Sequence, residues 1–296
     1  MSLCESLLPP IATLVPMRIH PDIERLRRAS RCHVIPFDGC DVACYEWGEG
    51  APLVLLHGGY GSWLHWLRNI DELARHYRVI AFDSPSHGES GDAPDDWDAR
   101  WMGEALAHSL KAVVGNTEPV RGIGFSMGGI LLGWMGVALQ DQLTHLVLAG
   151  PNGMSLAYPP LPKLMSMRAF GSAPTPAQVA SVHRWNLAAL MLSGPSAVDD
   201  LAVDVQTRNI ALCRVNSDHI PASNTLNDAL KHVPGRLVGV WGEHDAFVGP
   251  HMALRSKHLR SFDDRLTFHV IDGAGHWAMY ENPRLFNQIV LDELDI

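Results

Sequence analysis

A single serine stands between two glycines in the segment Gly124-Phe125-Ser126-Met127-Gly128, after one apolar run and before another. A strand, this G-x-S-x-G pattern and a helix together indicate a sharp turn that exposes a serine hydroxyl. The glycines are expected because neighbouring backbone approaches such a turn too closely for side chains. A helix N-terminus there also favours negative charge beside the hydroxyl. We therefore predict that Ser126 is a nucleophile.

A serine hydroxyl needs a base to remove its proton, and the chain offers 16 histidines. His276 is the predicted base, because its loop precedes the last expected helix and opens at the same sheet edge as Ser126. An acid must fix the imidazole tautomer and stabilise its charged form. Asp245 is preferred to its neighbours Glu243 and His244, because it lies farther along the loop after a strand. The order Ser126, Asp245, His276 is the one expected for this type of sheet.

Two backbone N–H groups are expected to bind the oxyanion that forms when the serine attacks a carbonyl. Met127 supplies the N–H directly after the nucleophile. The segment His57-Gly58-Gly59-Tyr60-Gly61 follows an earlier apolar run and supplies a second N–H, at Gly59 or Tyr60. Loss of one such donor typically costs about 3–4 kcal/mol in the transition state.

The elements that must position these residues alternate between apolar runs and helical patterns. Runs typical of strands, with the turns that stop them, occupy residues 33–37, 41–47, 52–59, 78–85, 120–125, 145–150, 236–245 and 266–275. Helices are expected near 63–74, 97–114, 127–139, 250–261 and 283–294, and Asp38-Gly39 predicts a hairpin turn. The alternation predicts the α/β class, with a mostly parallel sheet flanked by helices. Ligands bind such sheets at the carboxyl ends of the strands.

Residues 151–228 break this alternation, since the segment is rich in Pro and Met and has no strand pattern. We predict that it is a helical cap inserted over the strand ends. The core then comprises residues 1–150 and 229–296. The cap methionines either form an ordinary small core or line a lipophilic pocket.

Composition excludes several function classes. The net charge of −9 and the pI near 5.9 argue against a nucleic-acid partner. The arginines at 25, 27, 28 and 31 are interpreted as one solvated helix face. No membrane-spanning run or signal peptide is found, which predicts a cytoplasmic protein without a membrane partner. A small-molecule substrate is expected, and the sequence leaves homo-oligomerisation open.

Five cysteines, an odd number, do not indicate a disulfide framework and favour a reducing compartment. The spacing of Cys32, His33, Cys40 and Cys44 is too irregular for a zinc site. No metal and no organic cofactor are expected.

From about residue 30 onward the chain resembles the α/β-hydrolase fold. The segments LLHGGYGSWLHW, DSPSHGES, GFSMGG, WGEHDAFV and GAGHW stand in that family's order. The resemblance implies a serine nucleophile in a sheet with an inserted cap. It does not fix the substrate, because this fold hosts many chemistries.

Two subfamilies are similar to this chain. The hydrolases that cleave carbon–carbon bonds in aromatic ring-fission (meta-cleavage) products share the Gly58-Gly59 pair, a tryptophan after the histidine (Trp277) and a cap arginine, for which Arg208 is the best candidate. This resemblance implies that Arg208 pairs with a substrate carboxylate. Those enzymes usually carry asparagine where this chain has Phe125. GFSMGG instead resembles the serine site of simple esterases and of cofactor-free perhydrolases.

The first hypothesis is a serine hydrolase of a small, largely apolar ester, with Tyr60, Phe125, Arg208 and Trp277 as the expected substrate-binding residues. The second is the carbon–carbon bond hydrolase. The third, of another class, is a ligand receptor on a hydrolase scaffold, since a receptor can retain the same three residues.

Overall fold

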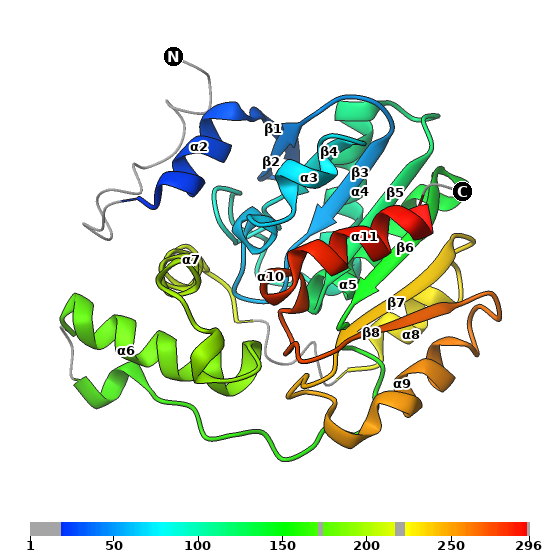
Figure 1. Ribbon diagram of the computed structural model, residues 1–296. Helices are drawn as coiled ribbons and strands as arrows, with labels where there is room; N and C mark the ends of the chain where they lie inside the picture. Colours follow the sequence, from blue (N-terminus) through cyan, green and yellow to red (C-terminus); the bar gives the residue numbers. More distant parts are fainter. Residues whose placement is uncertain (1–18, 171–173, 217–222, 295–296) are drawn as a thin grey trace.

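The computed structural model describes residues 19–170, 174–216 and 223–294, and an eight-stranded sheet forms their centre (Figure 1). Strand β1 pairs antiparallel with β2, and β2 pairs antiparallel with β4, whereas the remaining neighbours are parallel. The mostly parallel sheet expected from the sequence is confirmed. In spatial order the strands are β1 (Arg31–Phe37), β2 (Cys40–Trp47), β4 (Arg78–Phe82), β3 (Pro52–Leu56), β5 (Val120–Phe125), β6 (Leu143–Ala149), β7 (Arg236–Gly242) and β8 (Thr267–Ile271).

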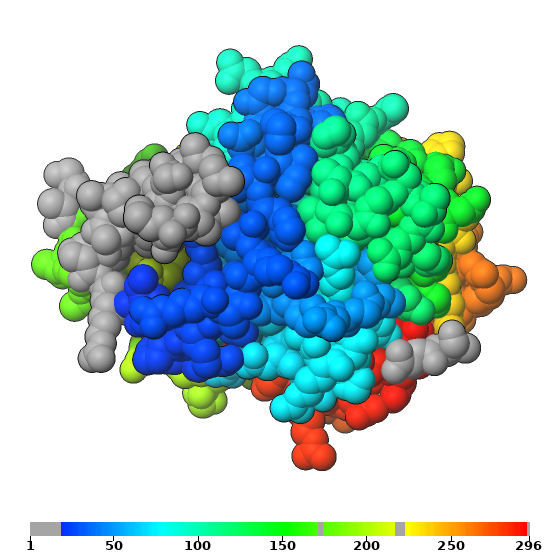
Figure 2. All heavy atoms as spheres, turned by 90° about the horizontal axis from the view of Figure 1, so that it is seen from above, coloured from blue at the N-terminus to red at the C-terminus, as the bar shows by residue number. Residues whose placement is uncertain are grey.

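The first two strands form the predicted hairpin. Asp38 and Gly39 at its tip both have positive φ, 47° and 79°, as a two-residue turn between twisted strands requires. On the surface this hairpin (blue) lies beside α4 (Ala99–Val114), as Figure 2 shows. The hairpin therefore closes one edge of the sheet.

Side chains of the central strands alternate between two hydrophobic layers. In β3, Leu53 and Leu55 face one layer, while Val54 and Leu56 face the other. Because helices cover both faces, these strands have continuous apolar sequences. The first layer includes α2 (Pro21–Ala29), α3 (Ile70–Leu73), α10 (Ala278–Glu281) and α11 (Pro283–Leu294); the second includes α4, α5 (Met127–Leu139), α8 (Thr225–Leu230) and α9 (Met252–Leu259).

One expected helix is wrong in its extent. Residues 63–74 form a 3₁₀ turn at Trp63–Trp66 and a separate short helix, α3. Asn69 between them is fully buried, and its side-chain amide donates to the Met279 carbonyl and to Asn287 Oδ1. These tertiary hydrogen bonds hold the backbone at Asn69 between the two short helices, where helical periodicity alone predicts one continuous helix.

The cap lies at the carboxyl ends of the parallel strands, where Figure 1 shows α6 (Pro176–Asn186) and α7 (Asp200–Ala211). A π-helical turn, Leu187–Met191, follows α6. The cap is tied to the core, since Trp277 N–H donates to the Met191 carbonyl at 2.7 Å and the Tyr280 hydroxyl donates to Asp199 at 2.6 Å.

The expected cap boundary at residue 228 falls inside α8, which belongs to the core. Leu226 of this helix is fully buried in the second hydrophobic layer. It packs so closely on α5 that a Cβ at Gly133 would lie 3.0 Å from its Cδ1. The helical insertion therefore ends before α8.

Of the cysteines that the structure describes, Cys40, Cys44 and Cys213 carry free thiols. Among the helices of the described residues, none combines the length and apolarity that a membrane span requires.

Candidate active site

Ser126 occupies the sharp turn between β5 and α5, with φ of 52° and ψ of −115°. The two flanking glycines are required by close backbone approach. A Cβ at Gly124 would lie 2.4 Å from the Gly128 carbonyl oxygen, and a Cβ at Gly128 would lie 2.3 Å from the Leu56 carbonyl oxygen. The turn expected from the pentapeptide is therefore present, with the serine at the N-terminus of α5.

His276 lies between β8 and α10, and Asp245 follows β7. Nδ1 of His276 is 2.8 Å from Oδ2 of Asp245, and both side chains are almost completely buried. The other carboxylate oxygen of Asp245 accepts the Phe247 N–H at 2.9 Å. A carboxylate at Nδ1 favours the tautomer that leaves Nε2 unprotonated. The exposed Glu243 instead accepts the Gly273 N–H, so tertiary structure selects Asp245 among the three neighbours.

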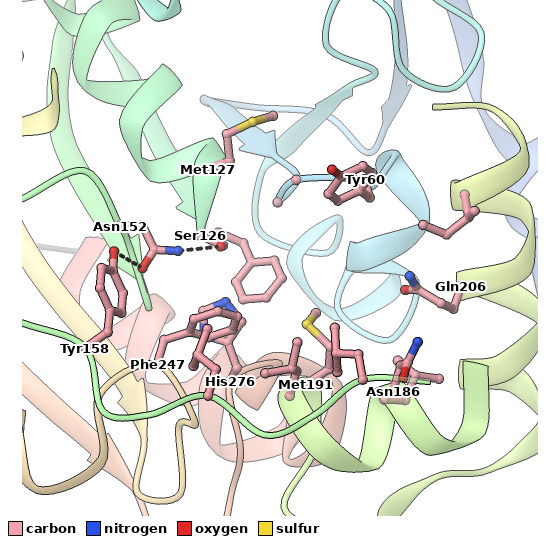
Figure 3. Close-up of a pocket in the computed structure, with 18 residues that line it drawn as sticks. Tyr60, Ser126, Met127, Asn152, Tyr158, Asn186, Met191, Gln206, Phe247 and His276 are labelled. Atoms are coloured by element: carbon pink, nitrogen blue, oxygen red, sulfur yellow. Dashed lines mark hydrogen bonds between the residues drawn. The ribbon is translucent and has the colours of Figure 1, made fainter. Parts of the chain in front are cut away.

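The serine hydroxyl contacts an amide that the sequence analysis did not single out. Asn152, in the loop after β6, donates from Nδ2 to Ser126 Oγ at 3.3 Å, and the Tyr158 hydroxyl donates to Asn152 Oδ1 at 3.1 Å. Figure 3 shows this chain of three residues on the side of the cavity where His276 also lies. Within the described chain the Ser126 hydroxyl makes no hydrogen bond to His276, a common feature of unliganded catalytic sites.

The loop after β3 lies directly against the nucleophile. A Cβ at Gly58 would lie 3.0 Å from the Phe125 ring and 3.2 Å from Ser126 Cβ. Tyr60 has a positive φ of 54°. Gly59, Tyr60 and Met127 all line the same cavity as Ser126. The two segments predicted to supply oxyanion donors are thus adjacent.

Two buried histidines bond to this loop, and a third, His87, packs against the ring of His57 with ring centroids 5.1 Å apart. His57 donates from Nδ1 to the Gly58 carbonyl, and its Nε2 accepts the Ser84 N–H. His65 Nδ1 accepts the Gly58 N–H at 3.2 Å. Burial lowers the pKa of His57 well below 6.5, that of His65 to about 3 and that of His87 to about 4. All three are therefore neutral.

The cavity above Ser126 has a volume of about 570 Å³ and lies between the strand ends and the cap. Its lining is mostly apolar, and within the described chain it includes no Lys, Arg, Asp or Glu. Its polar groups other than Ser126 and His276 are Tyr60, Asn152, Tyr158, Asn186 and Gln206; its apolar side chains are Phe125, Met127, Leu161, Leu164, Leu187, Leu190, Met191, Ile210 and Phe247.

Two predicted substrate-binding residues lie outside this cavity. Arg208 points away from it into a second, smaller cavity beside α2, and its Nε donates to Asp204 Oδ1 at 3.0 Å. Trp277 is fully buried, and its indole N–H donates to the His65 carbonyl at 3.0 Å. Both placements correct the prediction. Gln206 and Arg208 are two residues apart on α7, which is roughly half a helical turn. They therefore point in nearly opposite directions, and Gln206 faces Ser126's cavity in place of Arg208 (Figure 3).

Tyr60 and Phe125, in contrast, do line the cavity. Phe125 packs against the imidazole of His276, with ring centroids 4.9 Å apart, and Phe247 packs against the same imidazole at 4.6 Å. Sequence reasoning missed Asn152, and its one signal was a polar residue in the loop that follows a strand. Nothing in the sequence distinguishes Gln206 from other polar residues of its helix.

The model of the alpha/beta hydrolase family matches residues 53–289. The chain belongs to this family. Across 263 residues, 84% of this chain and 89% of the relative, it is 26% identical to a 2-hydroxy-6-oxo-6-phenylhexa-2,4-dienoate hydrolase of Comamonas testosteroni. This protein is accordingly an α/β-fold hydrolase.

Solved structures of α/β hydrolases show the same fold. A meta-cleavage product hydrolase from Pseudomonas fluorescens IP01 superposes with a TM-score of 0.69 at 21% identity, covering 89% of this chain and 97% of that one. An esterase from Rhodococcus sp. ECU1013 gives a TM-score of 0.68 at 20% identity, covering 90% and 98%. Since both activities occur on this fold, the substrate has to be argued from the site.

Proposed function

We propose that this hydrolase cleaves small, largely apolar carboxylic esters through an acyl-enzyme. The observation that carries the proposal is the position of Ser126 and the His276–Asp245 pair on one cavity whose described lining has no side chain of Lys, Arg, Asp or Glu. An uncharged, mostly apolar cavity favours a neutral ester over a carboxylate-bearing substrate.

In acylation, Ser126 Oγ attacks the ester carbonyl carbon while His276 Nε2 takes the hydroxyl proton. The carbonyl π electrons move to oxygen, and the N–H groups of Gly59 and Met127 bind that oxyanion. Asp245 stabilises the imidazolium. The intermediate collapses by breaking the bond to the alkoxy oxygen, which receives the proton from His276. Water then repeats these steps on the acyl-enzyme and releases the acid.

The first test is active-site labelling with a fluorescent fluorophosphonate. We expect stoichiometric labelling that vanishes in Ser126→Ala, and labelling and hydrolysis of p-nitrophenyl butyrate that fall at least about 100-fold in His276→Ala. Ser261→Ala, which changes an exposed serine hydrogen-bonded to His258, is the matched control and should label like the parent. Equal labelling of Ser126→Ala and the parent would refute the proposal.

The second candidate is the carbon–carbon bond hydrolase, which is favoured by the activity for which relatives such as the Comamonas testosteroni enzyme are named. Its discriminating measurement is kcat/KM for the chromogenic 2-hydroxy-6-oxo-6-phenylhexa-2,4-dienoate beside that for p-nitrophenyl esters. A higher value for the dienoate would replace the ester proposal. Turnover far below about 1 s⁻¹ on both classes, with tight ligand binding, would favour a receptor.

A further inference from the structure

The loop that follows β6 contacts every member of the Ser126, His276 and Asp245 set. Asn152 of this loop reaches Ser126 Oγ. A Cβ at Gly150 would lie 3.2 Å from both Asp245 Oδ2 and His276 Nδ1. The loop therefore packs on the acid–base pair through its backbone and reaches the nucleophile through one side chain.

This loop is held firmly on both sides. The Ser126 N–H donates to the Ala149 carbonyl and the Gly150 N–H donates to the Val240 carbonyl, both at 2.9 Å. On the α8 side, the Leu226 N–H donates to the Gly153 carbonyl at 2.9 Å. Gly150 and Gly153 have positive φ, 52° and 77°, which turns the chain between them. Asn152 is 6% exposed, so its amide is fixed beside the nucleophile.

Both ends of the Asn152 amide have a defined partner. Oδ1 accepts from the Tyr158 hydroxyl and Nδ2 donates to Ser126 Oγ. Burial raises the pKa of Tyr158, so its hydroxyl stays protonated as a donor at neutral pH. The buried Arg255 holds the neighbouring backbone, donating to the Ala157 carbonyl at 2.9 Å, and its guanidinium lies 5.6 Å from the Tyr158 ring centroid.

We propose that Asn152 is a further catalytic residue, whose N–H stabilises negative charge on Ser126 Oγ, and that Tyr158 is the positioning residue for its amide. The inference rests on the proposed function. Because Oγ accepts from Asn152, the single proton of the hydroxyl remains available for His276. As that proton leaves and the bond to the carbonyl carbon forms, Oγ gains negative charge and the amide hydrogen bond strengthens.

The same contact acts in deacylation. When the second tetrahedral intermediate collapses, the bond from carbon to Oγ breaks, and the electron pair returns to Oγ before His276 reprotonates it. Asn152 donates to this leaving oxygen as it does to the attacking one. Its loss should therefore lower kcat whichever step limits turnover, with little effect on KM, because the amide is not required for ground-state binding.

The test compares Asn152→Leu and the isosteric Asn152→Asp. A hydrogen bond to a charged group contributes about 1.5–3 kcal/mol, so we expect kcat and the fluorophosphonate inactivation rate to fall about 10- to 100-fold in Asn152→Leu, with KM nearly unchanged. Asn152→Asp keeps the shape and the Tyr158 contact but removes the donor, so it should lose at least as much. Asn287→Leu, which removes a buried amide bonded to Asn69, is the control: it should lower Tm without lowering kcat.

Tyr158 is tested by a double-mutant cycle. Tyr158→Phe should lower kcat less than Asn152→Leu, and the double variant should resemble Asn152→Leu alone, because Tyr158 acts through the amide. Additive losses would overturn the positioning role. Full activity of Asn152→Asp, or a higher kcat in Asn152→Leu, would overturn the catalytic role. If the parent enzyme fails to label at Ser126, the proposed function fails; if it labels and the Asn152 variants match it, only this inference fails.

Discussion

At the scale of the residue, the site combines backbone strain with buried neutral polar groups. Ser126 has a positive φ that L-residues rarely adopt, and such a conformation costs about 1–3 kcal/mol. His57 and His65 are buried near the site, and in the described part of the chain their ring nitrogens bond to backbone groups of Gly58 and Ser84. The strain at Ser126 and the burial of these histidines thus lower the stability of the fold, while they position the hydroxyl and the loop beside it.

The buried histidines predict a pH dependence of stability. Their lowered pKa values mean that, below about pH 6.5, the unfolded chain binds protons that the folded chain does not. The free energy of unfolding should therefore fall as pH drops from 7 to 4. Asp83 opposes this trend, because burial raises its pKa to about 7 from 3.8. Its effect on the unfolding free energy is outweighed, because three histidines, His57, His65 and His87, act in the other direction.

His65→Gln tests this account by removing one of the three titrations while keeping an acceptor for the Gly58 N–H. Between pH 6.5 and 4, the slope of the unfolding free energy against pH should become shallower by about 1.4 kcal/mol per pH unit. Urea unfolding at a series of pH values measures it. An unchanged slope would show that His65 is not a neutral buried group.

At the scale of the element, β5 and α5 meet at a turn that tolerates no side chain on either flank. The carbonyl oxygens that exclude a Cβ at Gly124 and Gly128 belong to backbone, which cannot rotate away as a side chain does. The helix must therefore start directly after Ser126, and this sets its N-terminus beneath the hydroxyl.

Gly128→Ala should lower the unfolding free energy by at least about 2–3 kcal/mol or prevent soluble expression. The matched control is Gly133→Ala in the same helix, where a Cβ would lie 3.0 Å from Leu226 Cδ1 and 3.1 Å from Ala229 Cβ rather than against a carbonyl oxygen. It should cost less, because alanine favours the helix by about 0.5–1 kcal/mol over glycine. Thermal melts of both variants measure the difference, and equal losses would contradict the backbone clash.

At the scale of the whole molecule, the seating of the cap on the strand ends decides which cap side chains face Ser126. Helix α7 contributes Gln206 to the cavity at Ser126, while Arg208 faces the second cavity and pairs with Asp204. Two residues that are only two positions apart in one helix therefore have unrelated roles.

Arg208→Ala should leave kcat/KM for p-nitrophenyl esters within about threefold of the parent. It should instead destabilise the fold by about 3–5 kcal/mol, since it leaves the buried Asp204 carboxylate without its guanidinium. Replacing both residues by leucine should recover much of that loss. A large fall in kcat/KM at unchanged Tm would return Arg208 to the substrate site.

Local periodicity and motifs with fixed neighbours were enough to predict the mostly parallel sheet with its inserted cap, and to select Ser126, Asp245 and His276 as candidates. The structure shows His276 bonded to Asp245, and it places Ser126 on the same cavity. Catalytic roles for the three await the labelling experiment.

The partners of the polar side chains, in contrast, depend on tertiary packing. Asn152 reaches Ser126 because β5 and β6 pair side by side, and the segments that follow them meet at the same edge of the sheet. Arg208 bonds to Asp204 because of the way the cap packs, and Trp277 bonds to the His65 carbonyl because of the way the loop after β8 packs. Sequence patterns record the period of an element, whereas the direction of one side chain depends on which distant surface the element packs against.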